Sequence, residues 1–147
     1  MLSKHDTLVI MINMGLHFID NPVKDFSRQD YQSQMTMILT YLHNFAIEHK
    51  NKNIFIYWRE TTAQHFPTSN GYWPGVRYSN HMKLKCVPIQ DTNYTSDWRN
   101  RIIEQIIWTG DLYKIQIISF YNITLPLWSS HPNGHMKDCT HFCWYIL

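Results

Sequence analysis

The order of two short apolar runs around a long amphipathic segment constrains this fold more than any other sequence feature. Thr7–Asn13 reads TLVIMIN, a continuous apolar run typical of a strand buried on both faces, and Asn53–Trp58 reads NIFIYW, a second strand-like run. Between them, Ser27–Lys50 carries apolar residues at helical spacing, with Ser27 as a candidate cap. A strand, a helix and a second strand form a βαβ unit, so we expect a parallel pair.

The second half of the chain repeats this alternation after a long insertion. Arg59–Thr95 is irregular but rich in aromatic residues, which predicts an ordered insertion over the strand ends. Ser96–Trp108 predicts a second helix with Gly110 as its stop, and Lys114–Phe120 predicts a third strand. The tail, Tyr121–Cys143, is loop-like. We therefore predict an α/β fold, a three-strand part of a doubly wound parallel sheet, within one domain spanning residues 1–147.

The predicted strand ends bring three polar segments to one edge of the sheet. Asn13 and Arg59 follow the first two strands, and the tail begins after Phe120. Sites in doubly wound sheets lie beyond the carboxyl ends of the strands. We therefore expect these segments to share one site.

Composition narrows the class of partner. The net charge is +2 without a basic run, which disfavours nucleic acid, and no apolar run is long enough to predict a membrane span. The first seven residues are polar and do not resemble a signal peptide. Aromatic residues make up 15% of the chain, which suits either a sugar-stacking surface or a well-filled core.

The tail carries Asp138 and His141 three residues apart. On a helical or turn-like backbone this spacing places both side chains on one face. The carboxylate then orients one imidazole nitrogen and leaves the other free as a base, which is half of a nucleophilic triad. The same spacing also fits a surface histidine beside an unrelated aspartate.

The sequence DCTHFC around these residues resembles the C-terminal block of the PC-esterase branch of the SGNH hydrolases. This branch includes the plant trichome-birefringence-like polysaccharide O-acetyltransferases. The resemblance implies an SGNH-like fold and an esterase or acyltransferase acting on acylated glycans without a cofactor. It also implies a location in the secretory pathway, and catalytic roles for Asp138 and His141.

Two upstream blocks extend the resemblance. VIMINMGLHF, at residues 9–18, is similar to a strand-end block in which Asn13 would help form the oxyanion hole. YWRETTAQHF, at residues 57–66, is similar to a segment in which Arg59 and His65 match family positions, which implies contacts with substrate. Arg59 also suits a loop-holding role, and Asn13 suits a turn. Trp73, with Tyr72 beside it, could stack on a sugar or pack under the insertion.

The resemblance further implies a pairing of the cysteines. The family pattern joins Cys139 to Cys86 and leaves Cys143 without a partner in this chain.

The nucleophilic serine of the family has no counterpart that we recognise. None of the serines follows an apolar strand in a Gly-Asp-Ser context, and Ser129 and Ser130 near the tail would need a different geometry. Since the chain starts at what would be the third family block, we expect the serine-bearing N-terminal part to be absent. We therefore predict a truncated or degenerate domain that is inactive, or nearly so, by itself.

Two other functions fit the same residues. His131, His135, Asp138, Cys139, His141 and Cys143 are all metal-ligand types, so zinc is a rival, although ligands one residue apart suit a structural site poorly. We predict no metal. The second rival is a non-catalytic module that binds a glycan or a protein partner through the aromatic insertion.

Overall fold

The structure, a computed structural model, describes residues 7–16, 18, 26–74, 85–91, 97–132 and 138–142. The chain forms two compact units. Unit 1 comprises Met1–Thr61 with Trp98–Ser119, and unit 2 comprises Thr62–Asp97 with Phe120–Leu147.

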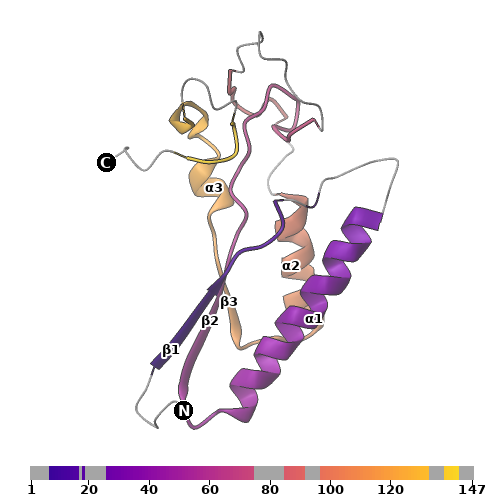
Figure 1. The fold of residues 1–147 in the computed structure, drawn as a ribbon, viewed down its shortest axis with the longest axis vertical. Coiled ribbons are helices and arrows are strands. Elements are labelled where there is room, and N and C mark those ends of the chain that lie inside the picture. Colours follow the sequence, from indigo (N-terminus) through magenta and orange to yellow (C-terminus); the bar gives the residue numbers. More distant parts are fainter. Residues whose placement is uncertain are drawn as a thin grey trace. The chain divides into compact units, whose positions relative to one another are not determined.

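Unit 1 contains a three-stranded parallel sheet in the order β1-β2-β3 (Figure 1). Its strands are β1 (Thr7–Ile12), β2 (Asn53–Arg59) and β3 (Ile115–Ile118). Leu8 pairs with Ile54, and Ile56 pairs with Ile115. The predicted mixed α/β fold with parallel strands is confirmed at this level.

Two helices of unit 1, α1 (Phe26–Glu48) and α2 (Trp98–Thr109), pack against each other. The buried side chains of α1 follow the helical period that the sequence predicted; they include Tyr31, Met35, Leu39 and Ala46. From α2, Trp98 packs edge to face on Tyr31, with ring centroids 5.4 Å apart. None of the helices within the described residues is long and apolar enough to cross a bilayer.

The prediction that β1 is buried on both faces is wrong. Exposed and half-buried residues alternate along it, and Val9 and Met11 are 57% and 60% exposed. Val9 pairs with Phe55 of β2, which is 44% exposed on the same face of the sheet. The apolar side chains that are buried in β2, Ile56 and Trp58, belong to the opposite face, where α1 contacts the strand. In the sheet that the described residues form, β1 is also the edge strand, so its apolar run is covered less than the sequence suggested.

Helix α2 ends beside the predicted Gly110, but through a different residue. Asp111 adopts the left-handed conformation, with φ of 51°. Leu112 donates its backbone N–H to Ile107 O (3.0 Å), and Asp111 donates to Trp108 O (3.3 Å). This is the hydrogen-bond pattern of a Schellman motif, and it turns the chain toward β3.

In unit 2 the tail is not wholly loop-like, as the sequence had suggested. It contains a short helix, α3 (Tyr121–Thr124), and a 3₁₀ turn, η1 (Trp128–Ser130). Thr124 Oγ1 accepts the backbone N–H of Ala63 (3.0 Å) and lies 2.8 Å from Phe120 O. A single turn of helix has no apolar period to detect, and this one is tied to a segment about sixty residues away in sequence.

The insertion is ordered where the structure describes it. Val87 donates its N–H to His65 O (3.0 Å), and a tight turn joins Phe66 N–H to Gly71 O (2.8 Å). Gly71 has φ of +76°, and a Cβ there would lie 2.2 Å from Gln64 O. Only glycine fits this turn, which lies directly beside His65.

Candidate functional site

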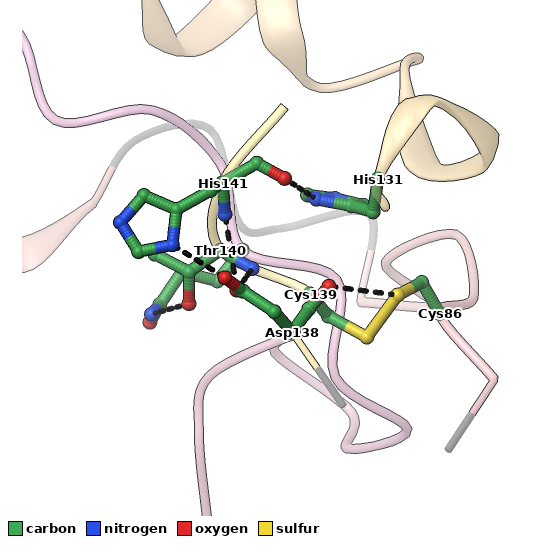
Figure 2. Close-up of polar contacts among 7 residues, drawn as sticks. Cys86, His131, Asp138, Cys139, Thr140 and His141 are labelled. Atoms are coloured by element: carbon green, nitrogen blue, oxygen red, sulfur yellow. Dashed lines mark hydrogen bonds and ion pairs between the residues drawn. A yellow bond between two sulfur atoms is a disulfide. The ribbon is translucent and has the colours of Figure 1, made fainter. Parts of the chain in front are cut away.

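Asp138 and His141 form a compact turn in unit 2 (Figure 2). One carboxylate oxygen of Asp138, Oδ1, accepts the backbone N–H groups of Thr140 (2.7 Å) and His141 (3.1 Å). The other oxygen, Oδ2, lies 2.5 Å from His141 Nδ1. Asp138 therefore shapes the turn with one oxygen and orients the imidazole with the other.

The two side chains of this pair differ in exposure. The Asp138 side chain is 26% exposed, whereas that of His141 is 74% exposed. Burial alone would raise the pKa of Asp138, but hydrogen bonds from the His141 ring and from two backbone N–H groups outweigh it and lower the pKa. Because Nδ1 faces the carboxylate, Nε2 is the ring nitrogen left without this partner, and no hydroxyl of the described residues hydrogen-bonds it.

Three connections anchor this turn to the insertion. His65 donates its backbone N–H to Cys139 O (2.8 Å), and Gln64 Nε2 donates to Thr140 Oγ1 (2.8 Å). Cys139 also forms a disulfide with Cys86, with Cα atoms 5.4 Å apart. The predicted disulfide is thus confirmed, while Cys143 lies outside the described residues.

Cys86 also approaches the turn directly. Its Sγ lies 3.7 Å from Asp138 O, a contact drawn in Figure 2. A disulfide sulfur carries no hydrogen, so this is a packing contact and not a hydrogen bond.

The side chains of His65 and His131 form a second pair in unit 2. His65 Nδ1 is 2.7 Å from His131 Nε2, and both residues are buried. The outer nitrogens face carbonyl oxygens: His65 Nε2 lies 2.9 Å from Leu125 O, and His131 Nδ1 lies 2.7 Å from His141 O. Burial lowers the pKa of both rings. The full burial of His65, with both nitrogens engaged inside unit 2, argues against its predicted contact with substrate.

The predicted oxyanion residue, Asn13, belongs to unit 1. Its Nδ2 donates to the carbonyl oxygen of Arg59 (2.8 Å) and joins the ends of β1 and β2. This supports the strand-closing role, and the amide keeps a second hydrogen. Because Asp138 and His141 belong to unit 2, the shared site stays a prediction.

The two aromatic residues of the insertion differ. Tyr72 is buried, and its backbone carbonyl accepts a hydrogen bond from Thr68 Oγ1 (2.9 Å), so it packs under the insertion. Trp73 is half-buried, which leaves its predicted sugar contact open as a prediction.

Sequence reasoning missed the polar first turn of α2. Arg99 is buried, donates from Nε to Gly15 O (2.7 Å), and also donates to Phe18 O. Asn100 accepts the N–H of Thr61 (2.8 Å) and donates to its carbonyl (3.0 Å). The periodicity of the apolar residues predicted this helix. Such periodicity does not indicate which polar side chains are buried and hydrogen-bonded to the backbone of a loop. The Arg99 guanidinium also lies 4.5 Å from the ring centroid of its neighbour Trp98, a contact that only the structure shows.

The zinc alternative loses one of its ligands. Cys139 is consumed by the disulfide, so it has no thiolate to offer. Across the segments that the structure describes, no three His, Cys, Asp or Glu side chains gather closely enough to hold a metal ion. His135 and Cys143 lie outside those segments.

Comparisons of the chain with protein-family models, with curated proteins and with solved structures gave no match.

Proposed function

We propose that unit 2 carries the base half of a carbohydrate O-acyl esterase or O-acyltransferase of the SGNH type. The observation that carries this proposal is the Asp138–His141 pair, in which a carboxylate holds Nδ1 and leaves Nε2 exposed. That arrangement is what acyl transfer requires of a general base. The resemblance of the surrounding residues supplies the substrate class, an acylated glycan.

The chemistry follows from the two nitrogens of His141. Nε2 takes the proton of an attacking hydroxyl while the oxygen of that hydroxyl bonds to the acyl carbon. The resulting imidazolium is stabilised by Asp138, which stays ionised, and it then returns the proton to the departing alcohol. The resemblance assigns the oxyanion donor to Asn13, which belongs to unit 1, so this role stays a prediction from the sequence.

The attacking hydroxyl is the missing component. No serine in the sequence has the family context, and Ser130 in η1 is buried. We therefore propose that the chain by itself turns over slowly or not at all. The Cys86–Cys139 disulfide supports a location in an oxidising compartment such as the secretory pathway.

Release of p-nitrophenolate from p-nitrophenyl acetate, with and without an added sugar alcohol as acceptor, tests the base. We expect slow release that disappears in His141→Ala and falls about tenfold or more in Asp138→Asn, because the ring then loses its orienting carboxylate. His49→Ala, in the turn that follows α1 in unit 1, is the matched control and should leave the rate unchanged.

The possible outcomes separate the two parts of the proposal. Release above the buffer background that is equal in the unmodified chain and in His141→Ala would overturn the base assignment. Robust turnover that vanishes in His141→Ala would support the esterase and contradict the inactivity. Mass spectrometry after the reaction then shows whether a serine has been acylated.

A second candidate function, glycan binding without catalysis, is favoured by one feature of unit 1. Trp108 and Tyr113 are 88% and 64% exposed, and both line a hollow of about 720 Å³ that also contains Arg101, Glu104 and Asp111. Flat rings beside charged side chains suit a sugar, whose apolar face stacks on a ring while its hydroxyls hydrogen-bond.

Titration of the chain with acetylated and unacetylated oligosaccharides, followed by tryptophan fluorescence and NMR, tests this candidate. Binding that is lost in Trp108→Ala and survives in both Asp138→Ala and His141→Ala would favour the binding module. Binding that is lost in His141→Ala and retained in Trp108→Ala would favour the esterase. If neither tryptophan fluorescence nor NMR detects glycan binding, the second candidate is contradicted.

A further inference from the structure

The hydrogen bonds of the buried His65–His131 pair demand more protons than two neutral rings can supply. Leu125 O and His141 O are carbonyl oxygens, which only accept, so His65 Nε2 and His131 Nδ1 must both carry a proton. The inner contact between His65 Nδ1 and His131 Nε2, at 2.7 Å, needs a third proton between the two nitrogens. Two neutral imidazoles have only two N–H groups in any tautomer.

We propose that His65 and His131 form a proton-sharing pair that binds one extra proton between their inner nitrogens, and that this proton positions His141 through its backbone carbonyl. In the neutral pair at most two of the three hydrogen bonds can exist. With one added proton all three form, and the pair is a monocation. The role in positioning His141 rests on the proposed function, whereas the proton sharing does not.

The surroundings of the pair favour one proton and oppose two. Both rings are buried, which disfavours charge, and the carboxylate of Asp138 offsets part of that penalty at His131. Among the residues that the structure describes, the charged or titratable groups that act on the pair are Asp138, His141 and the two rings themselves. A second proton would place two cations 2.7 Å apart without a counterion between them. Because burial lowers the pKa of both rings, the single proton should bind below the pH at which an exposed histidine titrates, about 6.5.

The pair is connected to the candidate base on both sides. His131 bonds to the carbonyl of His141, while the backbone N–H of His65 bonds to the carbonyl of Cys139, two residues earlier. The Phe142 ring also packs on His131, with centroids 4.3 Å apart. His131 is therefore a positioning residue: it holds the backbone next to the catalytic imidazole and stays out of the reaction itself.

NMR of the ¹⁵N-histidine-labelled chain during a pH titration tests the proton count directly. We expect the ring signals of His65 and His131 to shift together in one step that corresponds to one proton for the pair. The inner nitrogens should report a shared proton, and a second uptake should occur only when unit 2 unfolds.

His65→Gln tests the coupling, because a glutamine amide can still donate to Leu125 O but cannot share a proton with His131. We expect His131 to titrate alone in this variant. The amide chemical shift of Phe142, whose peptide bond contains the His141 carbonyl, should follow the shared step in the unmodified chain but not in His65→Gln. His49→Gln is the matched control. If His65→Gln does not fold, the ring signals of the unmodified chain decide by themselves.

Three results would overturn the proposal. One is a pair that stays neutral until the unit unfolds, and another is two rings that each bind a proton independently. The third is one equivalent of zinc in chain purified without a tag, removed by chelator, with both inner nitrogens unprotonated, because a metal would then occupy the two lone pairs. All three are read without any activity assay, so a failed esterase test leaves this proposal standing.

Discussion

The carboxylate of Asp138 bonds to both the ring and the backbone of His141: Oδ2 lies 2.5 Å from Nδ1, and Oδ1 accepts the N–H at 3.1 Å. The same side chain therefore orients the candidate base and closes the turn that carries it. Because Asp138 has both roles, we expect substitutions of Asp138 and of His141 to change the stability of the protein by different amounts.

His141→Ala should leave stability nearly unchanged while it removes the base. The ring is 74% exposed and the backbone bonds of the turn do not need it, so we expect a change within about 0.5 kcal/mol. Asp138→Ala, which removes the acceptor of three hydrogen bonds, should cost about 1–3 kcal/mol. Urea denaturation of both variants measures the difference, and equal losses would contradict the assigned roles.

Asp138 should make the protein more sensitive to acid. Its pKa is lowered in the folded state, so the stabilisation is fully present above the unfolded value of about 3.9 and is lost as the pH falls through the folded pKa. Urea titrations from pH 7 to pH 2 should show a steeper loss of stability for the unmodified chain than for Asp138→Asn. Parallel curves would mean that Asp138 has no such role.

Loss of the Cys86–Cys139 disulfide should destabilise unit 2 strongly. The bond spans 53 residues, for which chain entropy predicts about 4 kcal/mol. Cys86→Ser combined with Cys139→Ser should lower the denaturation midpoint to that of the reduced chain. A reduced chain as stable as the oxidised one would contradict the pairing.

Gly71→Ala should disrupt the turn beside His65. The new Cβ would lie 2.2 Å from Gln64 O, at a φ that disfavours any side chain, so we expect a loss of about 2 kcal/mol or more. The exposed neighbour provides the control, since Ser69→Ala should change little. Circular dichroism melts of the two variants give the comparison.

Polar substitution on the uncovered face of the sheet should be tolerated. Val9→Thr replaces a side chain that is 57% exposed and should cost less than about 0.5 kcal/mol. Ile56→Ala, on the covered face of β2, should cost about 2–5 kcal/mol. If Val9→Thr were as costly as Ile56→Ala, β1 would be buried on both faces, as its sequence first suggested.

Local sequence patterns predicted the helices and strands of unit 1 more accurately than they predicted which faces of those elements are buried. The helical period of Tyr31, Met35 and Leu39 marks α1 because burial of one face imposes it. The apolar run of β1 predicted a strand but misjudged its burial, because the coverage of each face depends on where the helices pack. The turn of helix at Tyr121–Thr124 could not be predicted, since a Thr124 bond to Ala63 holds it in place.

The sequence by itself determined the parallel α/β pattern, the Cys86–Cys139 pairing through a family resemblance, and the Asp138–His141 spacing. The α/β pattern depends on short-range periodicity and the Asp138–His141 spacing on a contiguous motif, whereas the cysteine pairing, 53 residues apart, came from the resemblance. Only the tertiary structure showed that His131 lies against His65, 66 residues earlier, and that Arg99 holds a loop 84 residues before it. A buried polar side chain has no period of its own, and its partner is set by how the backbone segments pack.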